Sequence, residues 1–130
     1  MMGETPIGEI STQALAYLGD CVIELYVRTH LVREKGLSTS AHLNTAALGY
    51  VRAPMQARAM ERILPLLDEE ETGVFRRGRN IGHTNTPKSA TVAEYRSATG
   101  MEVLFGWLYL MERHDRADEL FRAAYGLEET

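Results

Sequence analysis

The sequence predicts an all-α fold with one long buried helix at its centre, and three observations support this. Apolar residues recur at intervals of three and four along most of the 130 residues, which is the helical period. No stretch of four or more residues alternates convincingly between apolar and polar, as a half-buried strand would. The segment 100–111 is apolar nearly all round, which is typical of a helix enclosed by others. The length fits one domain, which we place over residues 1–130.

Capping residues and helix breakers divide the chain into successive helices. Ser11 or Thr12 can accept hydrogen bonds from a first turn, and Gly36 suits the end of that helix. Pro54 fits a first turn, where its missing N–H has no intrahelical partner, whereas Pro65 should distort the end of the same helix. The expected helices run from Ser11 or Thr12 to about Gly36, from Ser38 or Ser40 to about Tyr50, from Pro54 to about Leu67, from Asp68 to Arg77, from Val92 to His114 and from Arg116 to Tyr125, with a loop over 78–91.

Composition excludes several classes of protein. An apolar fraction of 45% and a charged fraction of 25% are those of a globular chain rather than a disordered one. The longest apolar run without a charge is the nine residues 103–111, and a bilayer span needs about 20, so we expect no membrane partner. No signal peptide is visible at the N-terminus. Cys21 is the only cysteine, which fits the reducing cytoplasm.

Charge is distributed unevenly along the chain. Lysine and arginine number 14 against 18 acidic residues, for a net charge of −4. After the acidic block 68–71, however, the segment 76–100 carries five basic side chains against one acidic side chain. This basic strip is either a solvated face or a surface for a polyanion. Charge alone favours the solvated face.

Two acidic residues stand in unusual helical contexts. On a helical projection Asp20 lies away from the apolar row through Leu15, Val22 and Leu25, which we expect to face the core, and beside Gly19, which would allow a close approach to the backbone. Glu102 lies within the apolar helix, where a carboxylate must be paired, hydrogen-bonded, protonated or bound to metal. Asp20 is either a solvent-facing acid or a ligand, and Glu102 is either half of a buried salt bridge or a metal or catalytic group.

Such a pair would suit metal-assisted chemistry on a phosphodiester. Mg²⁺ prefers carboxylate oxygens and keeps several waters, and a bound divalent ion can lower the pKa of water and neutralise charge on phosphate. Asp20 and Glu102 are therefore candidate Mg²⁺ ligands and catalytic residues. The basic strip beside them would hold the nucleic acid.

Two segments resemble the catalytic motifs of the ribonuclease III family. Residues 15–23, LAYLGDCVI, are similar to the signature helix, whose core is leucine, glycine and aspartate followed by small and apolar residues. Residues 99–110, TGMEVLFGWLYL, are similar to the second catalytic helix, in which a glutamate precedes an apolar run containing a glycine. Further segments, 50–57, 76–80, 87–88 and 95–100, resemble the mini-ribonuclease III branch. The resemblance covers about residues 12–112.

The resemblance implies an all-helical, homodimeric endonuclease domain that cleaves double-stranded RNA with Mg²⁺. In the mini branch the substrate is the precursor of 23S ribosomal RNA, and the separate double-stranded-RNA-binding domain is absent. By position, Asp20 corresponds to the signature aspartate and Glu102 to the final glutamate, a metal ligand. Gln13, Ala16 and Thr99 stand where full ribonuclease III has further carboxylates. These departures keep open an alternative, a non-catalytic helical RNA- or protein-binding module.

The remaining expectations concern the loop and the aromatic residues. A loop over 76–88 should bind RNA backbone through its basic and polar side chains. The RNA-binding candidates are Arg76, Arg77, Arg79, Asn80, His83 and Lys88. Tyr17 and Tyr109 sit at helical spacing among apolar residues and are expected in the core, and Cys21 is expected to be a small buried side chain.

Overall fold

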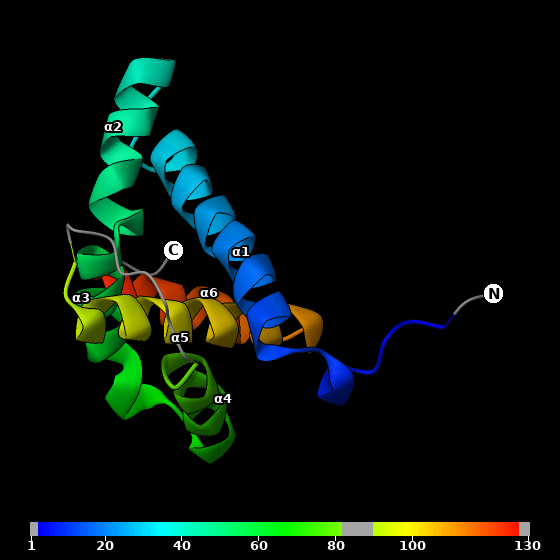
Figure 1. Ribbon diagram of the computed structural model, residues 1–130. Coiled ribbons are helices and arrows are strands. Elements are labelled where there is room, and N and C mark those ends of the chain that lie inside the picture. The colour runs from blue at the N-terminus through cyan, green and yellow to red at the C-terminus, as the bar shows by residue number, and fades with distance from the viewer. Residues whose placement is uncertain (1–2, 82–89, 128–130) are drawn as a thin grey trace.

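A computed structural model describes residues 3–81 and 90–127, and within these ranges every regular element is helical (Figure 1). The elements are η1 (Ile7–Glu9), α1 (Thr12–Arg33), α2 (Ser40–Val51), α3 (Ala53–Ile63), η2 (Leu64–Leu66), α4 (Glu69–Arg79), α5 (Val92–Leu110) and α6 (His114–Tyr125). The all-α prediction is therefore confirmed for the described chain. No helix in these ranges has the length and apolar character needed to cross a membrane.

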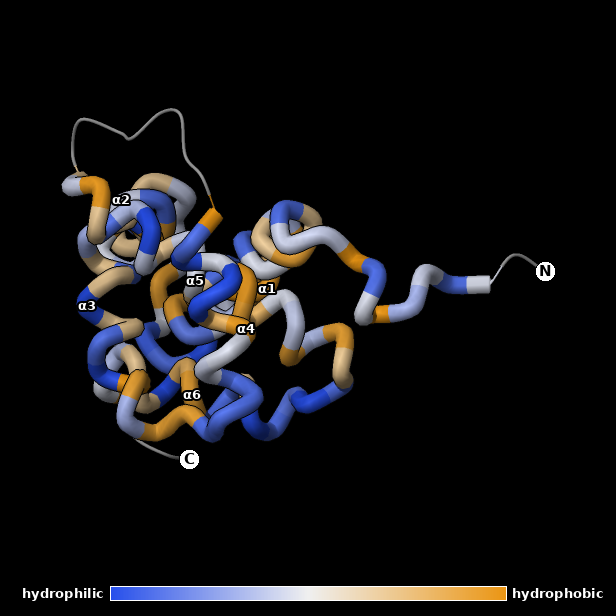
Figure 2. The backbone as a smooth tube through the Cα atoms, turned by 60° about the horizontal axis from the view of Figure 1, so that its bottom comes forward, coloured by the Kyte–Doolittle hydropathy of each residue, from blue (hydrophilic) through white to orange (hydrophobic). Residues whose placement is uncertain are grey.

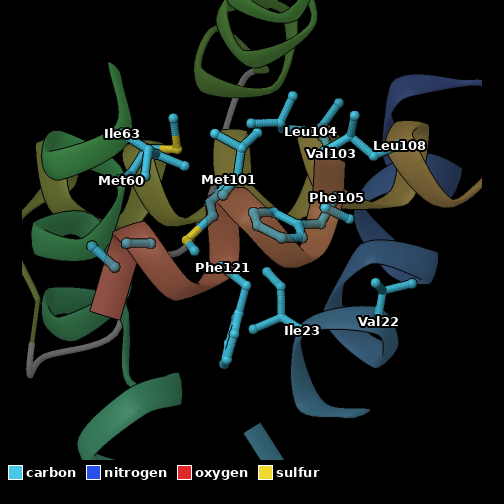
Figure 3. Packing of buried hydrophobic residues seen from close by; sticks show 14 of the residues in the cluster. Val22, Ile23, Met60, Ile63, Met101, Val103, Leu104, Phe105, Leu108 and Phe121 are labelled. Atoms are coloured by element: carbon cyan, nitrogen blue, oxygen red, sulfur yellow. The ribbon is translucent and has the colours of Figure 1, made fainter. Parts of the chain in front are cut away.

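Helix α5 occupies the centre, as the apolar segment predicted. It packs most extensively against α1, α4 and α3, and it also contacts α6 (Figure 1). In Figure 3, Ile23 of α1, Met60 of α3 and Phe121 of α6 converge on Met101 and Phe105 of α5. All five side chains are at most 1% exposed, so this cluster is the hydrophobic core.

Local sequence signals account for most of the helix boundaries. The Ser11 hydroxyl accepts a 3.0 Å hydrogen bond from the Ala14 N–H and begins α1. Asp68 and Thr91 form capping boxes with the glutamates three residues later, which begin α4 and α5. Pro65 lies in η2, where the chain tightens directly after α3. The N-terminal segment before α1 extends away from the helices (Figure 2).

Several predicted boundaries were wrong. Helix α3 ends at Ile63 rather than at about Leu67, because the chain tightens into η2 at Pro65. Helix α4 continues to Arg79 instead of ending at Arg77, so the first part of the predicted loop is helical. Helix α5 ends at Leu110 rather than at His114. Glu112 adopts a left-handed conformation with φ of 56°, and the Arg113 N–H donates to the Leu108 carbonyl over 2.9 Å, which is a helix-terminating motif usually signalled by glycine. No glycine marks this turn in the sequence.

The predicted inner face of α1 was also partly wrong. Leu15 and Val22 are buried, but Leu25 is 63% exposed and Tyr17 is 86% exposed. Cys21 is exposed as well. Apolar residues lie on two faces of this helix, and only one of them enters the core. On α5, Tyr109 is 46% exposed and was likewise wrongly assigned to the core.

Candidate active site

Two glycines allow α1 and α5 to cross in direct backbone contact. A Cβ atom built on Gly19 would overlap the Glu102 carbonyl group and lie 2.9 Å from the Gly106 nitrogen. A Cβ atom built on Gly106 would in turn overlap the Leu15 carbonyl oxygen and lie 3.0 Å from the Gly19 nitrogen. Both glycines are therefore needed for the crossing, as the sequence predicted for Gly19.

This crossing brings Asp20 and Glu102 together. Asp20 directly follows Gly19 and is exposed, whereas Glu102 is half-buried where its own carbonyl meets α1. Burial, and then the negative charge of Asp20 and its hydrogen bond to the Glu102 side chain, raise the pKa of Glu102 to about 8. The alternative of a buried salt bridge finds no support, because Glu102 forms no ion pair with a lysine or arginine among the described residues.

The pair has the chemistry of a divalent cation site. Two carboxylates that face each other repel when both are ionised, and a cation between them removes that repulsion. Mg²⁺ is commonly held by one or two carboxylates, with water and substrate phosphates completing its shell. The two side chains fit that role. Within residues 3–81 and 90–127 no cluster of three or more histidine, cysteine or acidic side chains comes together that could hold a metal.

The positions where the sequence departs from full ribonuclease III contribute no carboxylate here. Gln13 is exposed, and Ala16 packs against the core. Thr99 is 8% exposed, and its hydroxyl donates to the Tyr95 carbonyl over 3.0 Å. Glu24, one turn after Asp20, accepts a 3.0 Å hydrogen bond from the Arg28 side chain.

A second glycine crossing places the basic end of α4 near this pair. A Cβ atom on Gly78 would lie 2.8 Å from the Gly100 Cα atom, and Gly100 precedes Glu102 by two residues, about 3 Å along a helix axis. Arg77 donates to the Thr12 hydroxyl over 3.3 Å, and Arg79 lies 5.8 Å from the centre of the Phe75 ring. Each of these two arginine side chains is therefore held by a contact with a neighbouring side chain.

The other predicted RNA-binding residues divide into two groups. Arg76 is exposed on the last turns of α4, and Asn80 accepts a 3.3 Å hydrogen bond from Arg79. His83 and Lys88 lie outside the described residues. Arg79 was predicted to lie in the loop 78–91, but it is helical because α4 continues through it, and the acidic first turn and basic last turn of α4 both favour the helix dipole.

Comparison with known proteins agrees with this geometry. The pattern of the ribonuclease III domain matches residues 13–113, which include both acidic residues and both glycine crossings. The chain belongs to the ribonuclease III family. It is an endoribonuclease, as the sequence motifs predicted.

Individual relatives place the chain within this family. The Mini-ribonuclease 3 of Symbiobacterium thermophilum is 44% identical over 110 residues, which cover 85% of this chain and 84% of the relative. The Mini-ribonuclease 3 of Desulfitobacterium hafniense is 48% identical, over 83% of this chain and 68% of the relative. A crystal structure of a Fusobacterium nucleatum protein shares the fold with a TM-score of 0.82 and 28% identity, covering 95% of this chain and 98% of that one.

Proposed function

We propose that this ribonuclease III protein is a Mg²⁺-dependent homodimer that cleaves double-stranded RNA and matures the 23S ribosomal RNA precursor. One observation carries the proposal, the meeting of Asp20 and Glu102 at the crossing of α1 and α5. The pKa of Glu102 is raised by burial and by the nearby charge of Asp20, and a bound cation would lower it. Residues 1–130 would act as one nuclease domain.

Each acidic residue has a distinct contribution in this mechanism. A bound Mg²⁺ ion supplies an acidified water and charge neutralisation on the scissile phosphate. Asp20 is exposed, so its carboxylate would bind the ion on the side of the site that is open to substrate. Glu102 is half-buried, and its main chain contacts Gly19, so it would hold the ion with a carboxylate oxygen from a fixed position. A rigid helix crossing positions such a pair more accurately than a loop would.

The arginines of α4 are suited to the RNA backbone. Arginine binds phosphate with two parallel hydrogen bonds, and duplex RNA is recognised largely through phosphates, 2′-hydroxyl groups and shape. Gly78 lies between Arg77 and Arg79 and contacts α5, the helix that carries Glu102. His83 and Lys88 would extend this surface.

The exposed apolar face of α1 supports the homodimer. We define the α1 outer row as Tyr17, Cys21, Leu25 and Val32, which recur at intervals of four and seven. Three of them are large apolar side chains that are 86%, 63% and 53% exposed. Contiguous exposed apolar side chains mark interaction surfaces in water-soluble proteins. A two-fold pairing through this row would set two copies of Asp20 near one duplex, one for each strand.

Two further observations support the proposed substrate and compartment. Relatives named Mini-ribonuclease 3 match most of the chain, and maturation of the 23S precursor is the activity implied by that branch. The free Cys21 thiol is compatible with the cytoplasm, where we place the enzyme.

Cleavage of a long RNA duplex, compared with single-stranded RNA of the same sequence, tests the proposal. We expect products from the duplex only, and only when Mg²⁺ is present. A precursor fragment carrying the paired ends of 23S RNA should be cut at few positions, whereas a random duplex is cut at many. RNA binding without cleavage at any Mg²⁺ concentration would instead establish the alternative, a non-catalytic binding module.

A further inference from the structure

One face of α4 is buried against the rest of the molecule and carries a carboxylate among apolar groups. Glu71, Val74, Phe75 and Gly78 recur at intervals of three, one and three, so they share one face of the helix. All four residues are buried, and Glu71 is only 1% exposed. A glutamate therefore occupies a position on this face where an apolar side chain is the usual choice.

The Glu71 carboxylate is held by Arg116 of α6. Nε of Arg116 donates to Oε2 of Glu71 and Nη2 donates to Oε1, both over 2.8 Å, which is the paired hydrogen bonding that arginine makes with a carboxylate. Nη2 also donates to the Leu66 carbonyl over 2.7 Å, and Nη1 donates to Glu119 over 2.6 Å. Oε1 of Glu71 also accepts a 2.9 Å hydrogen bond from the Asp68 N–H. Arg116 thus connects the first turn of α4 to η2 and to α6.

The chemistry of this pair favours orientation over stability. The hydrogen bond from Arg116 lowers the pKa of the Glu71 carboxyl group, so the two side chains form an ion pair. A buried ion pair is often no more stabilising than apolar side chains of similar size, because both charges lose their hydration. Two parallel hydrogen bonds, however, hold the carboxylate and the guanidinium group in one relative orientation, which apolar contacts do not.

Two attachments on the same face determine how α4 lies across α5. Gly78 lies directly against α5, and Glu71 lies seven residues earlier, about 10 Å along the helix axis. The contact at Gly78 sets the distance between the two helices, whereas the contact with Arg116 sets the angle at which α4 crosses. Arg77 and Arg79 flank Gly78, so a change in this angle would move both guanidinium groups relative to the acidic pair.

We propose that Glu71 and Arg116 are positioning residues for RNA binding, whose ion pair fixes the direction of α4 and so places Arg77 and Arg79 along the RNA backbone. This inference rests on the proposed function, in which those two arginines hold phosphate. The pair acts through α4 and not by contact with RNA. Glu71 is enclosed, and all three nitrogens of the Arg116 guanidinium group already donate to protein oxygens.

A double-mutant cycle on RNA affinity tests the inference. The probe is a fluorescently labelled RNA duplex, bound to the full chain in EDTA so that it is not cut. Glu71→Gln keeps the side-chain shape and removes the charge, and it should weaken binding about fivefold, the equivalent of one net hydrogen bond. The single-turnover cleavage rate at saturating duplex with Mg²⁺ should stay the same, because the acidic pair is unaltered. In a background of Arg77→Ala and Arg79→Ala, Glu71→Gln should weaken binding no further.

Glu70→Gln is the matched control. Glu70 directly precedes Glu71 and pairs with Arg113, but its side chain is 58% exposed. Exposed ion pairs contribute little, so the same substitution there should leave the RNA affinity unchanged.

A second variant covers the case in which Glu71→Gln prevents folding by leaving Arg116 without its charged partner. Glu71→Leu combined with Arg116→Leu replaces the whole ion pair by apolar side chains, a change that other proteins tolerate without loss of stability. This variant should fold, as measured by thermal melts, and should still bind RNA about fivefold more weakly than the wild type, because the directional contact is gone.

The possible outcomes separate this inference from the proposed function. If the variant lacking Arg77 and Arg79 binds RNA as tightly as the wild type, both the proposed phosphate contact and the inference are overturned. If that variant binds more weakly, but Glu71→Gln weakens binding equally in its background and in the wild type, the pair does not act through the arginines and the inference alone is overturned. Wild-type affinity in the double leucine variant would also overturn it.

Discussion

The backbones of Gly19 and Gly106 meet where α1 crosses α5, with no room for a Cβ atom on either residue. This contact determines the separation of the two helices at the point where Asp20 and Glu102 face each other. The acidic pair is thus set by the main chain rather than by side-chain rotamers. Substitutions that change the crossing should affect activity even when both carboxylates remain.

Gly19→Ala tests this dependence directly. The added methyl group would overlap the Glu102 carbonyl, so the helices must separate, and we expect a decrease of about 1–3 kcal/mol in the free energy of unfolding. RNA cleavage per folded molecule should fall as well, because the carboxylates move apart. Urea unfolding and single-turnover cleavage measure the two effects.

Gly73→Ala is the matched control for that substitution. Gly73 lies within α4, and a Cβ atom there would meet nothing within 4 Å. Alanine in a helix is about 0.8–1 kcal/mol more favourable than glycine, so this variant should be slightly stabilised and fully active. Equal behaviour of the two variants would contradict the role that we assign to the crossing.

Asp20→Asn and Glu102→Gln should each abolish most of the Mg²⁺-dependent cleavage while leaving the fold intact. Both amides keep the side-chain shape and remove the negative charge. We expect rates about 10³-fold lower, because metal stabilisation of a phosphoryl transition state is worth several kcal/mol. Normal turnover by either variant, measured with saturating duplex RNA, would remove that residue from the site. Glu61→Gln, at an exposed position of α3, is the control.

The raised pKa of Glu102 predicts how stability depends on pH without metal. The pKa of its carboxyl group is about 8 in the folded protein, against a usual pKa of 4.5. The folded state then binds more protons than the unfolded state between these limits, so the free energy of unfolding should fall as the pH rises through this window. Because the group is partly solvated, we expect a decrease on the order of 1–2 kcal/mol.

Two comparisons isolate that effect. Glu102→Gln should remove the decrease, since it carries no ionisable group. Saturating Mg²⁺ should restore stability at pH 8 more than at pH 5, because the ion binds the deprotonated carboxylates. Thermal melts in EDTA and in Mg²⁺ measure both, and a wild-type pH profile identical to that of the variant would contradict the assignment.

The sequence predicted the elements that obey local rules and missed those that depend on tertiary contacts. The cap at Ser11 and the glycine at position 19 are local signals, and the structure confirms what they predicted. The turn at Glu112 carries no such signal, because a glutamate takes a conformation that usually requires glycine.

The site was predicted in part for the same reason. Asp20 and Glu102 were singled out as candidates because their helical contexts and motifs are local, and the structure brings the two side chains together. The exposure of Leu25 was missed, because α1 has apolar residues on two faces and periodicity alone does not show which face is covered.

Leu25→Lys should convert the proposed dimer into a monomer. Leu25 is central in the α1 outer row and is 63% exposed in the single chain, so a lysine there costs the monomer little. In a two-fold interface the change places two ammonium groups against one apolar surface, where unpaired charge is strongly disfavoured. Light scattering at micromolar concentration should show half the mass of the wild-type protein.

Leu66→Lys provides the control for dimerisation. Leu66 lies in η2, away from α1, and is 50% exposed. This variant should keep the mass of the wild-type protein and its ability to cut both strands. A wild-type monomer that cleaves both strands of a duplex would contradict the dimer altogether.

Replacement of Arg77 and Arg79 by alanine should weaken RNA binding more than it slows single-turnover cleavage. Both arginines lie on the last turn of α4, outside the acidic pair, so under the proposed function they would hold phosphate and take no part in the chemistry. The logarithmic dependence of affinity on salt should become less steep by up to about 0.9 for each phosphate that is no longer neutralised, because fewer counterions are released. Arg58→Ala, which removes an exposed arginine from α3, should leave affinity and salt slope unchanged. If the double variant also keeps the wild-type affinity and salt slope, the arginines of α4 form only a solvated surface and the RNA binds to another face.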